Sequence, residues 1–282
     1  MNQVGVITTS YNQHGFLTQA IESVLKQTHQ DFLLYVVNDY RGRANSESVE
    51  TDLNGRIKHY WDDRIKLVHN EKNLWISRSR NVALRSLLDA DVSSIFFIDH
   101  DDVWKDTDKL SKQIEVLSEW EIGILWTQFE VIDDVNTVIG GSNNPLLHED
   151  IRKIILLACP VLLSTMWVRS EVFKAAGLFD ERYNGSDDWE FLIRSSGLFR
   201  TANLPDKLTQ YRYYETNTSQ TQWHRLVEEH IQIIREVWST QNGYYRALLI
   251  EYMKWMMPPK YRKSLKKLKK YILPKYNTYE VK

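Results

Sequence analysis

Three carboxylates stand within four positions of the chain, at Asp99, Asp101 and Asp102. They follow residues 94–98, an apolar run rich in Ile and Phe that is typical of a buried strand. Side chains at the carboxyl end of such a strand project into the ligand crevice of an open α/β sheet. Acids this close repel one another unless a cation or hydrogen-bond donors compensate them. The pattern favours a Mg²⁺ or Mn²⁺ ion, which takes oxygen ligands and leaves positions for phosphate, over a solvated turn that caps the next helix.

Other polar residues follow earlier strands and should reach the same edge of the sheet. Asp39 comes directly after the apolar run 31–37, and Thr9 and Tyr11 lie at and just beyond the end of the run 4–9. The Asp39 carboxylate can accept a hydrogen bond from a nucleobase N–H or a ribose hydroxyl, and the Tyr11 ring can stack on a base. Alone, Asp39 is equally well explained as a turn former.

A second acidic cluster occupies residues 187–190. Acids in the first turn of a helix are often only caps, because the helix dipole favours negative charge there, and Asp187 fits that role. A general base, in contrast, must stand near the reacting groups and be partly desolvated. Asp188 is the best candidate for such a base outside the first cluster.

The elements that must position these residues alternate over the first hundred positions. This alternation predicts a parallel sheet that is covered on both faces. Strands are predicted at 4–9, 31–37, 64–68 and 95–98, and helices at 16–26, 47–60 and 78–88, the last with Ser77 as its N-cap.

After residue 104 the pattern becomes mixed. Gly177 is a stop signal for the second of the helices predicted there, and from residue 222 onward the chain is expected to be entirely helical. Strands are predicted at 123–130, 131–139, 164–169 and 207–214, and helices at 106–117, 171–176 and 187–196.

The composition excludes several classes of protein. The 282 residues carry a net charge of −1, which gives no sign of a nucleic-acid partner. Cys159 is the only cysteine, so no internal disulfide can form. There is no signal-peptide pattern, no apolar run of about 18 residues, and no P-loop, GxGxxG or CxxC motif. We therefore expect a soluble cytoplasmic protein.

The end of the chain is strongly basic. Residues 254–275 contain nine Lys or Arg residues interleaved with aromatic and aliphatic side chains, and no acid. A basic amphipathic segment of this kind can lie on an anionic membrane surface. The alternatives are a solvated helical face and an arm packed on the body of the protein.

Taken together, the motifs resemble the family 2 glycosyltransferases, which have the GT-A fold. The resemblance covers about residues 3 to 215, and the ordered set of motifs is more specific than any one of them. The matching stretches are VITTSYN (6–12), AIESVLKQT (20–28), residues 32–39, SRN (79–81), FIDHDDVW (97–104), FKAAGLFD (173–180), DDWEFLIR (187–194) and YR (211–212).

The resemblance implies a GT-A domain over residues 1–215, with a nucleotide-binding half (1–104) and an acceptor half (105–215), followed by a helical extension (216–282). It also implies an inverting transferase that uses a nucleoside-diphosphate sugar, with a UDP-sugar favoured, and a glycan or lipid-linked acceptor in surface polysaccharide synthesis. The implied roles are nucleotide or donor binding for Thr9, Tyr11, Asp39, Arg80 and Asp101, Mn²⁺ or Mg²⁺ binding for Asp102, and general base for Asp188.

Two positions depart from the family's usual pattern. The family usually reads Asp-Asp-Gly-Ser where this chain has residues 38–41 (NDYR), and it usually has glycine where this chain has Trp75. Two other interpretations remain open. One is a haloacid dehalogenase-type phosphatase with Asp99 as nucleophile, and the other is a catalytically silent GT-A domain that binds a carbohydrate or a partner protein.

Overall fold

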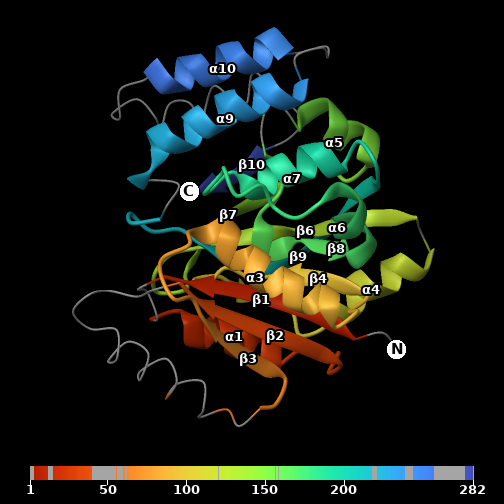
Figure 1. Cartoon of the computed structure of the whole chain (residues 1–282). Coiled ribbons are helices and arrows are strands. Elements are labelled where there is room, and N and C mark those ends of the chain that lie inside the picture. The colour runs from red at the N-terminus through yellow and green to blue at the C-terminus, as the bar shows by residue number, and fades with distance from the viewer. Residues whose placement is uncertain are drawn as a thin grey trace.

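Four parallel strands form the first half of a ten-stranded sheet, in the spatial order β3-β2-β1-β4 (Figure 1). Strands β1, β2 and β4 are short apolar runs that are mostly buried, as the sequence predicts, whereas β3 at the edge is partly exposed. Their bounds are β1 Val4–Ser10, β2 Phe32–Asn38, β3 Ile65–His69 and β4 Ser94–Phe97. The computed structural model describes residues 3–11, 15–39, 62–119, 121–155, 159–217, 221–238, 244–256 and 277–281, together with 55, 60 and 157.

Two helices cover the opposite faces of these strands. Helix α1 (Leu17–Leu25) packs its apolar residues against the β1 face that carries Val4 and Val6. Helix α3 (Ile76–Asp89) packs Leu84 and Leu87 against the other face. The parallel, doubly covered arrangement predicted from the alternation of strands and helices is confirmed.

The second half of the sheet is largely antiparallel. Strand β8 pairs antiparallel with both β4 and β6, and β7 pairs antiparallel with β6, whereas β9 runs parallel to β6 and antiparallel to β5. The bounds are β5 Val103–Trp104, β6 Ile122–Ile132, β7 Val138–Asn143, β8 Trp167–Arg169 and β9 Arg200–Arg212. The remaining helices of this half are α4 Lys109–Glu119, α5 His148–Ile154, the 3₁₀ turn η1 Leu163–Thr165, α6 Ser170–Ala176 and α7 Asp187–Ser195.

Several predicted boundaries were wrong in this half. Strand β6 covers the strand expected at 123–130 and runs on to Ile132, so the strand expected at 131–139 is instead the end of β6, a turn in which Asn136 has a φ of 68°, and the start of β7. The strand expected at 164–169 begins with the turn η1, and β9 starts seven residues before the predicted 207. Helix α6 does end at Gly177, whose φ is 87°.

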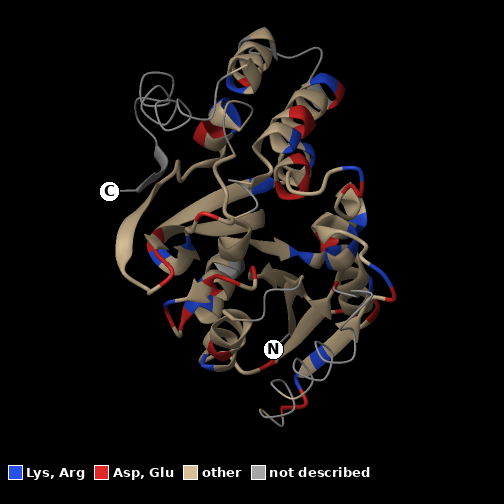
Figure 2. Cartoon of the chain, turned by 90° about the vertical axis from the view of Figure 1, so that its left-hand side faces the viewer, with Lys and Arg blue, Asp and Glu red and all other residues tan. Residues whose placement is uncertain are grey.

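The C-terminal extension consists of helices α9 (Trp223–Trp238) and α10 (Tyr244–Met256), which lie side by side at the end of the molecule opposite β3 (Figure 1). The all-helical expectation fails beyond them, because β10 (Asn277–Val281) pairs antiparallel with β7 at the sheet edge. Acidic and basic residues are interspersed over the ribbon (Figure 2). The predicted helix 47–60 and most of the basic tail lie outside the described residues. No described helix is long and apolar enough to cross a bilayer.

Candidate active site

The sheet brings the predicted site residues to one edge. The Asp39 N–H donates to the Ser10 carbonyl at 2.9 Å, and the Ile98 N–H donates to the Ile7 carbonyl at 3.0 Å. The carboxyl ends of β2, β1 and β4 therefore lie next to one another, which gathers the residues that follow each strand. Thr9 is buried in β1, whereas Tyr11, just beyond it, is half exposed.

Asp39 is a buried carboxylate that anchors the loop between β3 and α3. Its Oδ1 accepts hydrogen bonds from Asn70 Nδ2 at 2.8 Å and from the Leu74 N–H at 2.7 Å. Both of these bonds go to Oδ1. This geometry suits a carboxylate that is held rigidly for recognition.

The three acids after β4 have different environments. Asp102 is fully buried: Ser164 Oγ donates to its Oδ2 at 2.5 Å and the Arg212 N–H donates to its Oδ1 at 2.9 Å. Asp101 is also buried, and its Oδ2 accepts from the Tyr214 hydroxyl at 2.8 Å. The Asp99 side chain remains 29% exposed.

The crowding of the three acids has its largest effect on Asp102. Burial, and then the negative charges of Asp101 and Asp99, raise the pKa of Asp102 well above its usual range. No group of three or more His, Cys, Asp or Glu side chains among the described residues is arranged to hold a metal ion by itself. The donor set nevertheless fits a Mg²⁺- or Mn²⁺-type site, because such ions are commonly held by one or two carboxylates together with the phosphates of a substrate.

Arg80 connects this cluster to the second group of acids. Its Nη2 donates to Asp99 Oδ1 at 3.0 Å and its Nη1 donates to Asp187 Oδ2 at 2.7 Å. Burial opposes the charge of Arg80, but Asp187, Asp99 and Asp188 together raise the pKa of its guanidinium above the usual value. The donor-binding role of Arg80 stays a prediction. In the structure, Arg80 lies between the two acidic clusters.

Asp188 has the environment that a general base needs. It lies in the first turn of α7, partly exposed, and its Oδ1 accepts from the Trp189 N–H at 2.7 Å. Burial, and then the charge of Asp187, raise the pKa of Asp188 to about 7, against the opposing effect of Arg80. A carboxylate with this pKa can exchange a proton near neutral pH.

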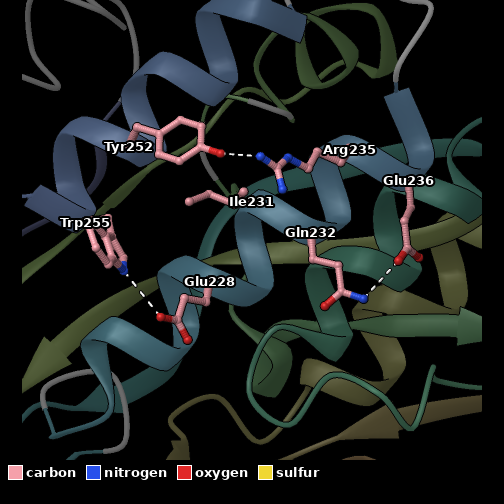
Figure 3. A pocket seen from close by; sticks show the side chains of 7 residues that line it. All are labelled: Glu228, Ile231, Gln232, Arg235, Glu236, Tyr252 and Trp255. Atoms are coloured by element: carbon pink, nitrogen blue, oxygen red, sulfur yellow. Dashed lines mark hydrogen bonds between the residues drawn. The ribbon is translucent and has the colours of Figure 1, made fainter.

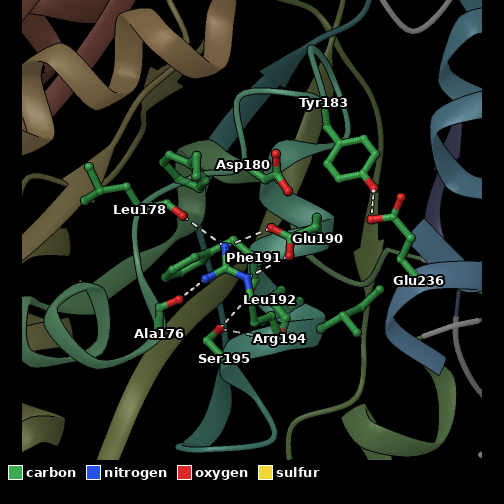
Figure 4. Close-up of polar contacts among 12 residues, drawn as sticks. Ala176, Leu178, Asp180, Tyr183, Glu190, Phe191, Leu192, Arg194, Ser195 and Glu236 are labelled. Carbon is green, nitrogen blue, oxygen red and sulfur yellow. Dashed lines mark hydrogen bonds and ion pairs between the residues drawn. The ribbon is translucent and has the colours of Figure 1, made fainter. Parts of the chain in front are cut away.

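Helix α7 is held firmly in place, and Asp188 with it. Arg194 donates to Glu190 at 2.7 Å and to the carbonyls of Ala176 and Leu178 (Figure 4). On the opposite side of the helix, Trp189 Nε1 donates to the Ile155 carbonyl at 2.6 Å. These contacts fix the helix relative to the sheet.

Sequence reasoning missed three partners of the carboxylates: Ser164, Arg212 and Tyr214. Arg212 lies in the stretch that resembles the family, but nothing in the sequence places its backbone against Asp102. Ser164 gave one signal, since it interrupts the apolar run 154–168. His230 of α9 contacts the Trp189 ring, with centroids 4.4 Å apart, and faces Glu251.

The family model for glycosyl transferase family 2 matches residues 5–177, more than half of the chain. The chain belongs to this family. The match decides against the phosphatase interpretation of Asp99. It also spans the strands β1, β2 and β4 and the loop that carries the three acids.

Glycosyltransferases of several bacteria are similar to about half or to more than three quarters of the chain. An uncharacterized glycosyltransferase of Haemophilus influenzae is 28% identical over 83% of this chain and 72% of its own length. The putative teichuronic acid biosynthesis glycosyltransferase TuaG of Bacillus subtilis is 26% identical over 78% of this chain and 82% of its own. The UDP-Glc:alpha-D-GlcNAc-diphosphoundecaprenol beta-1,3-glucosyltransferase WfgD of Escherichia coli is 32% identical over 49% of both chains. These relatives support a glycosyltransferase role in polysaccharide synthesis.

Solved structures confirm the GT-A fold. S. aureus TarS, in complex with UDP-GlcNAc, matches 95% of this chain and 77% of its own with a TM-score of 0.64 and 18% identity. The mannosyltransferase PcManGT from Pyrobaculum calidifontis, in complex with GDP-Man and Mn²⁺, matches 97% of this chain and 82% of its own with a TM-score of 0.62 and 14% identity.

Proposed function

We propose that this family 2 enzyme transfers a sugar from a nucleoside-diphosphate sugar, with a UDP-sugar favoured, to a hydroxyl of a glycan or lipid-linked acceptor. The observation that carries the proposal is the chain of contacts Asp99–Arg80–Asp187, which joins the β4 acids to the helix that bears Asp188. A candidate anchor for a diphosphate and a candidate base thereby belong to one rigid unit. TarS bound to UDP-GlcNAc and the lipid-linked acceptor named for WfgD support the two classes of substrate.

The residues divide the work as follows. Asp39 Oδ2 accepts a hydrogen bond from the nucleoside, and Thr9 and Tyr11 border the same end of the sheet. Asp101 faces the ribose or the sugar, and Asp102, with Asp101 beside it, holds a divalent ion, as the neighbour crystallised with Mn²⁺ suggests. Such an ion, when bound, neutralises charge on a departing diphosphate.

Asp188 supplies the proton acceptor. It takes the proton from the acceptor hydroxyl while the acceptor oxygen bonds to the anomeric carbon and the bond from that carbon to the diphosphate oxygen breaks. The nucleoside diphosphate leaves with that electron pair. Because this is one in-line displacement, the configuration at the anomeric carbon inverts.

We further propose that the extension contacts an anionic membrane on its cytoplasmic face. Helix α10 exposes Tyr245, Leu249, Met253 and Met256, which recur at helical spacing, and its one acid, Glu251, is buried. Residues 257–276 then add eight Lys or Arg and no acid. Exposed apolar residues beside a polybasic segment suit an interfacial helix.

Polar side chains of α9 and α10 bond to one another. A cavity of about 620 Å³ opens between α9 and α10, in which Glu228 accepts from Trp255 and Arg235 donates to Tyr252 (Figure 3). Glu251 faces both His230 and Lys254. Burial opposes ionisation, but these two neighbours hold the pKa of Glu251 at about 2. Glu251, the one acid of α10, therefore faces α9 and lies away from the exposed apolar side chains of α10.

The transferase proposal is tested by turnover. UDP-sugars are incubated with Mn²⁺ and a polyprenyl-diphosphate-linked sugar, UDP release is measured, and the new glycosidic bond is assigned by NMR. We expect acceptor-dependent UDP release and inversion at the anomeric carbon. Retention of configuration would overturn the single-displacement mechanism.

A further inference from the structure

Trp75 holds a backbone conformation that residues with side chains rarely adopt. At the N-cap of α3 its φ is 69° and its ψ is 169°, a region that is populated essentially by glycine alone. Its side chain gains little from burial in return, because it is 51% exposed. Backbone strain of this kind is concentrated at binding and catalytic sites, where the surrounding structure imposes it.

Hydrogen bonds on both sides fix the backbone of Trp75. The Leu74 N–H donates to Asp39 Oδ1 at 2.7 Å, and the Trp75 N–H donates to Asn73 Oδ1 at 2.8 Å. The Trp75 carbonyl accepts from the Ser79 N–H at 3.0 Å, in the first turn of α3. The position of the indole is therefore set by the loop that Asp39 anchors.

Asp39 also lies beside Tyr11. Its N–H donates to the carbonyl of Ser10, the residue before Tyr11, while its Oδ1 accepts from Leu74, the residue before Trp75. Tyr11 is 50% exposed and Trp75 is 51% exposed. In the described part of the chain, these are the exposed aromatic side chains outside α10.

We propose that Tyr11 and Trp75 form the two walls of a slot for the planar base of the donor nucleotide, with Asp39 between them as the hydrogen-bond acceptor for a base N–H. This inference rests on the proposed function, since it presupposes a nucleotide donor. Every base offers a flat π face, so two exposed rings beside one carboxylate suit a base. Trp75 is then a specificity-determining residue that the fold retains at a cost in stability.

Arg225 of α9 contacts the Trp75 indole. Its guanidinium carbon lies 5.7 Å from the centre of the indole ring, and its Nη2 donates to the Asn184 carbonyl at 2.5 Å. Asn184 precedes the first turn of α7 by three residues. The wall of the slot is thus attached to the loop that leads into Asp188.

The test compares Trp75→Gly and Trp75→Phe with the wild-type protein. Stacking on an aromatic ring contributes about 1–3 kcal/mol per base, so we expect Trp75→Gly to weaken UDP binding in the presence of Mn²⁺ by about 5- to 150-fold. Trp75→Phe retains a ring and should keep most of the affinity. Inorganic pyrophosphate with Mn²⁺ has no base, so its affinity should not change in either variant.

Stability should move in the opposite direction to affinity. Glycine relieves the strained backbone, so Trp75→Gly should raise the Tm on the order of 2–4 °C. Asp91, just beyond the other end of α3, has a φ of 52° and an exposed side chain, so Asp91→Gly is the matched control. It should gain stability without any change in UDP affinity.

Three outcomes would overturn the slot. Unchanged UDP affinity in Trp75→Gly, while the wild type binds UDP, would remove Trp75 from the nucleotide site and leave the proposed function standing. Equal weakening of UDP and pyrophosphate binding would show that the substitution acts on the whole loop. A wild-type protein that binds none of the nucleoside diphosphates would overturn the proposed function itself.

Discussion

Arg80 donates to Asp187 at 2.7 Å across 107 positions of sequence, and both side chains are buried. The same guanidinium donates to Asp99. One cation therefore connects the end of the central strand β4 with the start of α7, the two places where the acids of the candidate site stand. Because both partners are charged and out of water, the geometry depends on each of them being present.

Replacing Arg80 should lower the free energy of unfolding substantially. Arg80→Met leaves Asp187 buried without its counter-charge, and breaking a buried pair in this way costs about 3–5 kcal/mol. The free energy of unfolding, measured with urea, should fall by that amount. Arg78, two residues before Arg80 on the exposed side of α3, pairs with Glu181 at the surface. Arg78→Met is the control and should cost less than about 1 kcal/mol. Equal losses in the two variants would contradict the role given to Arg80.

Asp188 should control the acidic limb of the pH profile. The carboxylate accepts a proton only when ionised, and its pKa is raised to about 7. The value of kcat/KM should therefore rise with pH up to about 7 and stay level above it. Asp188→Asn should lower kcat by about 10²- to 10⁴-fold and remove this limb, with UDP affinity unchanged. A midpoint near pH 4 in the wild type, or an acidic limb that persists in Asp188→Asn, would contradict this account.

Asp102→Asn should separate metal binding from folding. Asparagine can still accept from the Arg212 N–H and can donate to Ser164, but it carries no charge in a site that disfavours one. The metal-free protein should be at least as stable as the wild type, and the added stability with Mn²⁺ and UDP should disappear. At ligand concentrations of about 100 Kd that stabilisation is about 2.7 kcal/mol.

The control for this variant is Asp106→Asn. Asp106 is a nearby acid outside the cluster, and it pairs with Lys112 at the surface. The variant should keep the full response to Mn²⁺ and UDP. If Asp102→Asn also kept that response, the metal would have to be held without Asp102.

The basic tail should increase binding to anionic lipid. Truncation would be a poor test, because β10 pairs with β7 at the sheet edge. Replacing Lys266, Lys267, Lys269 and Lys270 by Gln leaves β10 intact. At about 1 kcal/mol per basic residue, partitioning onto phosphatidylglycerol vesicles should fall by about 10²- to 10³-fold, while phosphatidylcholine vesicles serve as the uncharged control. Unchanged partitioning onto the anionic vesicles would remove the tail from membrane binding.

The parallel half of the fold could be predicted almost to the residue, because its strands are short apolar runs that end in polar residues. The predicted runs 4–9 and 31–37 correspond to β1 and β2 within one residue at each end. The error in the antiparallel half came from Val131 and Ile132. They continue β6 into a tight turn, although their apolar character also fits the start of a new strand. The predicted N-cap of α3, Ser77, was wrong. The N-cap is Trp75, and the Ser77 hydroxyl donates to the Tyr183 carbonyl instead.

The candidate site could be predicted only in part. Asp39 and the β4 acids follow β2 and β4, the two parallel neighbours of β1, so strand order alone brings them to one edge of the sheet. The partners of Asp102 reach it through long-range pairing: β9 brings Arg212 beside it, and the turn η1 brings Ser164. No local pattern in the sequence encodes such contacts. The strained backbone of Trp75 could not be predicted either, because the sequence shows only a bulky residue where the family usually has glycine.

Thermal unfolding in the presence of nucleotides tests the central claim most directly. The Tm is measured with UDP, GDP, dTDP and CDP, each with and without Mn²⁺. A nucleoside-diphosphate site built on Asp39, Asp101 and Asp102 predicts that Mn²⁺ and a nucleotide together raise the Tm more than either alone, with the largest rise for UDP. If the Tm stays the same with every nucleotide in the presence of Mn²⁺, the protein does not use a nucleotide-sugar donor at this site.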